Sequence, residues 1–236
     1  AFEFGRWAIE DPDAVARLLP GRAGERTEAL EDIIARREAH LVCYQSRRLA
    51  RRYRRLIDLA PDPALQRAVA EGYHKLLAYK DEYEVGRLLS TSAEKVARRF
   101  DGDLRLSWHL APPVLSTPGP DGRPHKRRFG PWIVPAFKLL ASLKFLRGTP
   151  FDPFGWQSER RVERALVSEY EADLEDALRR MTPQTREATL QLAALPREIR
   201  GFGPVKTASI ERYKARRAAL LDAIRDGGDG FATAAE

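Results

Sequence analysis

The chain has 236 residues, of which 43% are hydrophobic and 32% are charged, and its formal net charge is +7. This composition excludes an intrinsically disordered protein, and the length allows one sizeable hydrophobic core. The single cysteine, Cys43, excludes an internal disulfide framework, and no apolar run is long enough to span a membrane. Because no secretory leader is present either, we expect a cytoplasmic protein that does not contact the membrane.

Apolar residues recur at helical spacing through the first hundred residues, and proline and capping residues divide them into segments. Pro61 and Pro63 mark the end of one helix and the start of the next, and Ser92 is a candidate N-cap. The predicted helices span about residues 11–19, 28–58, 63–89 and 92–100.

The spacing changes to a period of two at residues 103–109, which is typical of a half-buried strand. The proline- and glycine-rich segment 118–122 and a second strand at 126–129 complete a predicted hairpin over about residues 103–129. Further helices are predicted at about 135–146, 158–180, 183–195 and 204–224. The sequence therefore predicts a mostly α fold: a single helical domain over residues 1–226 with one β-hairpin, and a flexible tail over 227–236.

Known cofactor and metal motifs are missing from the sequence. The glycine pair Gly201 and Gly203 has no third glycine and no preceding strand, so a helix break is favoured over a phosphate loop, although an anion can bind at such a helix N-terminus beside Lys206. The four histidines do not pair at ligand spacing, and one cysteine cannot hold an iron–sulfur cluster. We expect no catalytic residue, no metal and no cofactor in this chain.

A charged segment at residues 80–84 has two interpretations. Buried together, its side chains would shift one another's pKa values and serve as acid or base. Alternatively they form a structural ion-pair cluster, flanked by Tyr79 and Tyr83 at i and i+4. The structural interpretation is favoured, because no nucleophile or cofactor motif accompanies the candidates Lys80, Asp81, Glu82 and Glu84.

A run of arginines between Arg47 and Arg55 accounts for part of the basic charge. Binding of nucleic acid would require one exposed basic face with interleaved aromatic side chains, and only Tyr53 interleaves here. We therefore predict a solvated helix end or a contact with another domain. In the second case, the run would serve an interface or steer an acidic partner toward the protein.

Short strings rich in proline, glycine and aromatic residues separate the predicted helices. They are AFEFGRW at 1–7, YKDEYEV at 79–85, HLAPP at 109–113, FGPW at 129–132, RGTPFDPFG at 147–155 and RGFGPVK at 200–206. Taken together and in this order, they resemble the C-terminal region of the long fused indolepyruvate ferredoxin oxidoreductases. The resemblance spans nearly the whole chain, and it implies a piece of a longer polypeptide.

The resemblance implies a large cytoplasmic parent enzyme that oxidatively decarboxylates an aryl 2-oxoacid onto coenzyme A and reduces ferredoxin. Thiamine diphosphate with magnesium and iron–sulfur clusters would supply the chemistry from upstream domains. The chain itself would be a non-catalytic domain that packs against the catalytic domains or a second subunit of a homodimer. The resemblance also implies a family-like structural or interface motif, whose residues are Tyr79, Lys80, Asp81, Glu82, Tyr83, His109, Trp132, Asp152, Arg200 and Lys206.

Two alternatives come from other classes of protein. One is a free-standing basic helical module that binds nucleic acid, although nucleic acid is not the partner that the mixed charge favours. The other is a small independent enzyme that uses Lys80 and Asp81. Continuation of the open reading frame upstream of Ala1 distinguishes both from the domain of a larger oxidoreductase.

Overall fold

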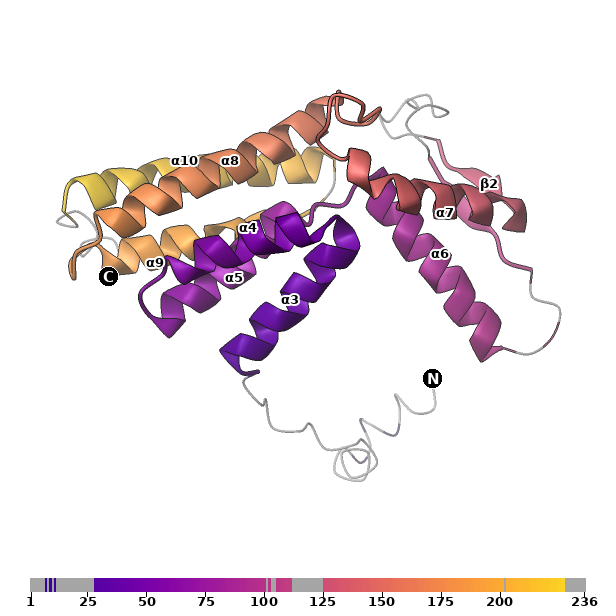
Figure 1. Ribbon diagram of the computed structural model, residues 1–236, viewed down its shortest axis with the longest axis horizontal. Coiled ribbons are helices and arrows are strands. Elements are labelled where there is room, and N and C mark those ends of the chain that lie inside the picture. The colour runs from indigo at the N-terminus through magenta and orange to yellow at the C-terminus, as the bar shows by residue number, and fades with distance from the viewer. Residues whose placement is uncertain are drawn as a thin grey trace.

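The computed structural model describes residues 28–100, 105–111, 125–201 and 203–227, together with positions 7, 9, 11 and 102. These residues form a mostly helical protein with one two-stranded antiparallel hairpin, as predicted (Figure 1). None of the helices described is both long and apolar enough to cross a membrane.

A helical bundle makes up the larger part of the molecule. In Figure 1, α8 and α10 run side by side, with α9 below them and α3 to α5 completing the bundle. Its elements are α3 (Leu30–Tyr44), α4 (Arg47–Asp58), α5 (Pro63–Leu77), α8 (Ser158–Arg179), α9 (Arg186–Ala194), the 3-10 turn η3 (Leu195–Glu198) and α10 (Pro204–Arg225).

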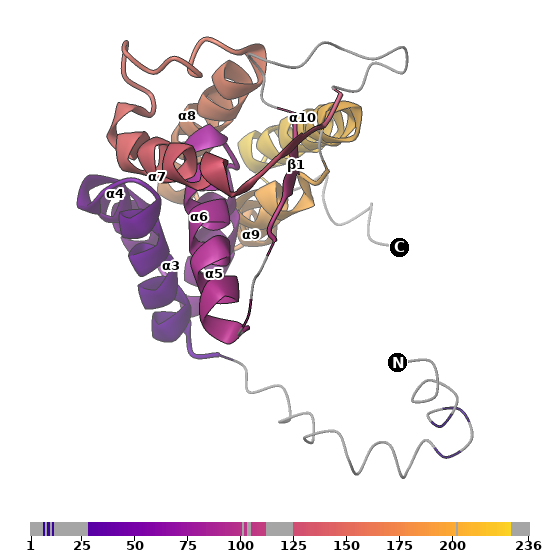
Figure 2. The same ribbon diagram turned by 90° about the vertical axis from the view of Figure 1, so that its right-hand side faces the viewer.

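A smaller unit extends from the bundle along α6. Figure 2 shows α7 lying across α6 with the hairpin beside them, and α6 and α7 pack closely. The hairpin pairs Trp108 with Phe129. The elements of this unit are α6 (Glu82–Arg99), β1 (Trp108–Leu110), β2 (Arg127–Phe129), η1 (Pro131–Ile133), α7 (Val134–Ser142) and η2 (Leu143–Leu146).

The core of the bundle is rich in buried tyrosines. The rings of Tyr53, Tyr73 and Tyr170 stack in sequence, with centroid distances of 6.0 and 5.7 Å. Their hydroxyl groups donate to Ala70 O, to the Glu171 carboxylate and to Ala193 O respectively. These bonds satisfy polar atoms that would otherwise be costly to bury, so each ring contributes apolar area without an unpaired hydroxyl.

The smaller unit has a separate apolar cluster. Phe129, Ile133 and Phe137 are buried there, and Trp108 packs edge-on against Phe137 at 5.7 Å. Leu89 of α6 also contacts this cluster. The two apolar clusters are therefore distinct, and α6 carries the smaller one away from the bundle.

Three helix predictions were wrong, and the strand predicted at 103–109 is shorter than expected, since β1 begins at Trp108. The helix predicted over 28–58 is broken at residues 45–46, where the Ser46 hydroxyl accepts from Leu49 N and caps α4. The helix predicted over 63–89 is broken at 78–81, where the Asp81 carboxylate caps α6. Ser92 is not a cap, because α6 continues through it to Arg99. The predicted helix at 11–19 and nearly all of the predicted tail lie outside the described residues.

Close packing of α5 on α9 depends on a glycine. A Cβ atom at Gly72 would overlap the carbonyl oxygen of Ala193 and approach Pro196 Cδ at 3.3 Å. We expect Gly72→Ala to lower the melting temperature by at least about 5 °C, because overpacking opposes the gain of about 1 kcal/mol in helix propensity. Thermal unfolding measures this.

The matched control for that prediction is Ala165→Gly, on the exposed face of α8. It changes helix propensity without altering a packed interface, so a smaller decrease is expected. A Gly72→Ala protein that melts at or above the wild-type temperature would contradict the close approach of α5 and α9.

Candidate functional site

A buried ion pair joins the two parts of the fold. Asp81 and Arg147 are each only 3% exposed, and Arg147 Nη2 and Nε donate to the two carboxylate oxygens of Asp81 at 2.8 and 2.5 Å. The same carboxylate accepts from Glu84 N at 2.9 Å at the start of α6. Burial alone would lower the pKa of Arg147, but the hydrogen bonds to Asp81 raise it above its usual value.

The carbonyl end of α3 lies against this pair. Arg147 Nη1 donates to Tyr44 O at 2.7 Å, and its guanidinium lies 3.6 Å from the centroid of the Tyr44 ring. Lys144 Nζ donates to Cys43 O at 2.7 Å. The last carbonyls of a helix lack partners within the helix and favour cations, so these two side chains complete α3 from more than a hundred residues away in the sequence.

Asp152 organises the loop after Arg147. Its buried carboxylate accepts from Gly148 N at 2.9 Å and from Phe154 N at 3.1 Å within the loop. It also accepts from the Tyr83 hydroxyl of α6 at 2.9 Å. The proline-rich string at 147–155 is therefore folded around one carboxylate and attached to α6 through Tyr83.

A second polar cluster lies at the start of α8. Arg160 Nη1 donates to Lys80 O at 3.0 Å and pairs with Glu163 at 2.6 Å. Glu163 is buried and also pairs with Lys206 of α10. Burial raises the pKa of Glu163, while Lys206 and Arg160 act in the opposite direction. This cluster connects the 78–81 turn with both α8 and α10.

Two of the predicted acid–base candidates, Asp81 and Glu84, are hydrogen-bonded to arginines. Both oxygens of Asp81 bind Arg147, and Glu84 accepts from Arg87 at 2.8 and 2.5 Å. Glu82 differs, because its Oε2 atom is buried without a hydrogen-bond partner and burial raises its pKa. This geometry favours the structural interpretation of the segment over an acid–base site.

The ten predicted motif residues do not form a single site. Tyr79, Lys80, Arg200 and Lys206 line one cavity of about 360 Å³ between the 78–81 turn and the start of α10. Asp81, Tyr83 and Asp152 lie in the buried polar network described above, and Glu82 lies beside it. His109 and Trp132 are exposed in the smaller unit, apart from the network.

The arginine run is divided between ion pairs and open positions. Arg52 forms a bidentate pair with Glu171 of α8, and Arg55 lies 3.4 Å from Glu175. Arg54 pairs with Asp58 and Glu31 instead. The run therefore spreads over several faces of α4, as its spacing indicates, and several of its charges hold neighbouring helices together. It does not present one continuous free basic face.

Two histidines lie against each other between α3 and α5. His40 Nδ1 and His74 Nε2 are 3.0 Å apart, so one ring donates and the other accepts. Burial lowers the pKa of His74 to about 3, with a smaller contribution from Arg37. Among the described residues, no group of three or more His, Cys, Asp or Glu side chains is placed to hold a metal ion.

Sequence reasoning missed several members of the network. Tyr44, Arg147, Arg160 and Glu163 are central to it, yet none was singled out as a site residue. The one signal in the sequence was Arg147 itself, which opens the string at 147–155. The others occupy ordinary helical positions, and only the tertiary fold brings them together.

The comparisons with known proteins give one match. A model described as "Family of unknown function (DUF6537)" matches residues 30–219. This range runs from the start of α3 through most of α10, so it includes both parts of the fold and the buried network. No curated protein and no solved structure matches the chain.

The buried pair gives a direct test of the structural interpretation. We expect Asp81→Ala to destabilise the fold by roughly 3–5 kcal/mol and to lower the melting temperature by roughly 10 °C, because it leaves the Arg147 charge buried without its partner. Thermal unfolding measures this, with Glu94→Ala in the exposed Glu94–Lys138 pair as the control.

The control should move the melting temperature by no more than about 2 °C. An unchanged melting temperature for Asp81→Ala would contradict the structural interpretation of the pair.

The histidine pair predicts a pH dependence of stability. The pKa of His74 is about 3 in the folded chain and about 6.5 when the side chain is exposed, so between these values the unfolded state binds a proton that the folded state does not. The free energy of unfolding should therefore fall as the pH decreases from 6.5 to 3. His74 contributes at most about 1.4 kcal/mol per pH unit to this slope.

Denaturant unfolding across that pH range should show a shallower slope for His74→Gln than for the wild type. His109→Gln, at an exposed position in β1, should keep the wild-type slope. Equal slopes for the wild type and His74→Gln would show that His74 is not held neutral by the fold.

Proposed function

The chain belongs to the family of unknown function DUF6537, and we propose that it is the non-catalytic C-terminal domain of a cytoplasmic 2-oxoacid:ferredoxin oxidoreductase. In this proposal the parent enzyme acts on an aryl 2-oxoacid such as indolepyruvate, with thiamine diphosphate and iron–sulfur clusters in its other domains. The resemblance of the six sequence strings supports this parentage. An exposed aromatic edge supports the role of the domain.

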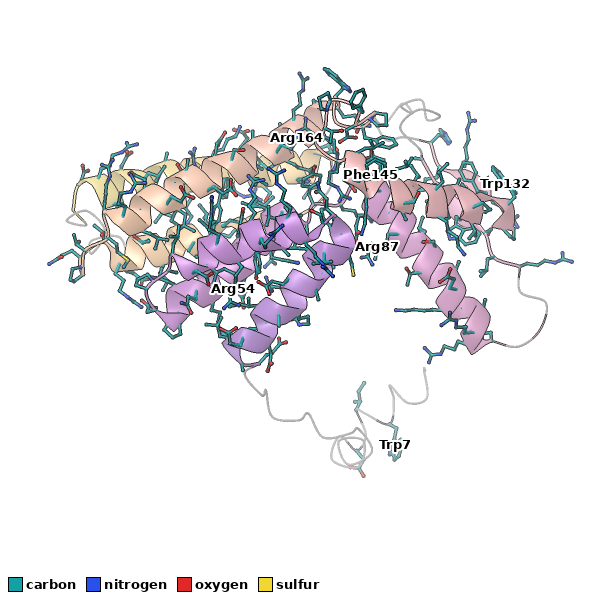
Figure 3. The ribbon with its side chains drawn as sticks, viewed as in Figure 1. Trp7, Arg54, Arg87, Trp132, Phe145 and Arg164 are labelled. Carbon is teal, nitrogen blue, oxygen red and sulfur yellow. The ribbon has the colours of Figure 1, made fainter. Side chains whose placement is uncertain are left out.

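The aromatic edge is the observation on which the role depends. We define it as five large apolar side chains, all between residues 131 and 157 and all more than 60% exposed. Figure 3 labels two of its members, Phe145 and Trp132, on the part of the molecule that contains η2, α7 and η1. The edge consists of Trp132 (70%), Leu139 (61%), Phe145 (63%), Phe151 (81%) and Trp156 (74%).

Such a concentration of exposed aromatic residues is typical of an interface. Interface cores are enriched in Trp, Tyr and Phe, and four of these five side chains are Trp or Phe. Two of the resembling strings, FGPW and RGTPFDPFG, supply two of the five residues, and Trp156 directly follows the second string. Part of the exposed apolar surface therefore comes from the strings that carry the family resemblance.

The edge is held in place before any partner binds. Its loop residues Phe151 and Trp156 flank Asp152 in the sequence, and the Asp152 carboxylate accepts from two backbone N–H groups that fix the 147–155 string. Phe145 lies beside Lys144, which bonds to the end of α3. A rigid apolar surface loses little conformational entropy on docking, so this arrangement favours stable packing against the catalytic domains of the same polypeptide.

The internal polar networks agree with a domain that does no chemistry. In the 79–85 segment, Asp81 is paired with Arg147 and Glu84 with Arg87, so neither carboxylate is a free acid or base. A basic nucleic-acid module is less well supported, since Arg52, Arg54 and Arg55 are engaged in ion pairs.

The proposal predicts that the aromatic edge binds the rest of the parent enzyme. The 236-residue chain should co-purify with the separately expressed catalytic part, and Trp132→Ser, Phe151→Ser and Trp156→Ser in combination should weaken this binding by at least about tenfold. Truncated interface aromatics commonly cost this much or more. The exposed substitutions should leave the melting temperature of the chain nearly unchanged.

Leu59→Ser is the control, because Leu59 is an exposed apolar residue at the far end of α4. It should bind like the wild type. Binding of the triple variant at wild-type strength would contradict the proposed interface. An open reading frame without upstream 2-oxoacid oxidoreductase sequence would contradict the parentage as well.

A further inference from the structure

A basic cavity lies between α4 and α8. Its volume is about 730 Å³, within the range of small-molecule sites. Among the described residues, no Asp or Glu side chain lines it. Figure 3 labels one of its residues, Arg164, on α8. The cavity is lined by six arginines: Arg48, Arg51, Arg52, Arg55, Arg147 and Arg164.

Half of these arginines are already neutralised from outside the cavity. Arg52 pairs with Glu171, Arg55 with Glu175, and Arg147 with Asp81. These pairs also hold α4 and residues 147–148 in position at the wall of the cavity. Arg48 and Arg51 form no ion pair with any of the described residues. Arg164 Nη2 donates a hydrogen bond to Gly155 O at 2.6 Å, while its other terminal nitrogen, Nη1, is buried without a hydrogen-bond partner.

The spacing in the sequence brings these three cations toward one another. Residues 48, 51, 52 and 55 follow the i, i+3, i+4, i+7 pattern and share one face of α4. Arg164, Val167 and Ser168 share the face of α8 that lines the same cavity. Like charges at these spacings repel on a helix, so an anion bound between them would stabilise α4.

We propose that this cavity binds a small molecule that carries a diphosphate group. A guanidinium group matches phosphate oxygens in a bidentate geometry, and Arg48 and Arg51 approach from α4 while Arg164 approaches from α8. A single carboxylate offers two oxygens, which is too few for three cations on two sides. The remaining volume, beside Leu49, Leu77 and Val167, accommodates a less polar part of the ligand.

Other groups at the cavity fit the same ligand class. Ser46, Ser168 and Tyr79, whose side chains carry hydroxyl groups, are also among the lining residues. The N-terminus of α4 also opens at the cavity, and its backbone dipole adds to the positive potential there.

Titration calorimetry and thermal unfolding of the 236-residue chain, with inorganic pyrophosphate at constant ionic strength, test the proposal. Pyrophosphate should bind saturably, raise the melting temperature, and bind at least about tenfold more tightly than inorganic phosphate. The double substitution Arg48→Gln and Arg51→Gln should weaken binding by at least about tenfold, because it removes two of the three lining cations that form no ion pair with a described carboxylate.

The matched control is Arg47→Gln with Arg161→Gln. It removes the same charge from exposed positions on the same two helices, outside the cavity lining. This control should bind pyrophosphate within about twofold of the wild type, because it alters the net charge and leaves the contacts in the cavity unchanged.

Three outcomes would overturn the proposal. The first is the absence of saturable pyrophosphate binding up to millimolar concentration. The second is an equal loss of affinity in both double variants, which would show attraction by net charge alone. The third is binding of a poly-glutamate peptide without binding of pyrophosphate, which would assign the arginines to an acidic protein partner.

Discussion

The fold depends on the buried pair between Asp81 and Arg147. One carboxylate caps α6, and one guanidinium binds that carboxylate and the last carbonyl of α3. A pair this deeply buried gains stability only if each partner is fully hydrogen-bonded, and here the carboxylate and the guanidinium each bind a backbone group in addition. Three segments that are distant in the sequence meet at this point: the end of α3, the start of α6 and the end of η2.

That junction determines what the smaller unit can present. The unit's own apolar cluster is small, with Phe129, Ile133 and Phe137 as its buried members among the described residues. Its position relative to the bundle is fixed largely through α6 and through the loop that Asp152 organises. The aromatic edge and the basic cavity share this loop, since Arg147 and Gly148 line the cavity while Phe151 and Trp156 belong to the edge. One short string thus borders both candidate binding surfaces.

The sequence predicted elements well where local pattern decides them. The helix predicted at 158–180 is α8 (Ser158–Arg179), and the one predicted at 204–224 is α10 (Pro204–Arg225), because periodicity and an N1 proline are local signals. The breaks at 45–46 and 78–81 were missed. Apolar spacing continues through both, and the partners that stabilise the breaks, Arg147 and Arg160, are 66 or more residues away. The 79–85 segment was identified as a unit, whereas its partners require the tertiary fold.

The arginines show why net charge alone is a poor guide to function. From composition, the run at 47–55 is one basic patch, and the value of +7 suggests a polyanionic partner. In the fold, Arg52, Arg54 and Arg55 are structural, since each meets a carboxylate of the same chain. The remaining positive charge is concentrated at Arg48, Arg51 and Arg164. These three residues come together because the faces of α4 and α8 that carry them line the same cavity. The unpaired charge, and not the total, is therefore the quantity that a ligand of this protein would recognise.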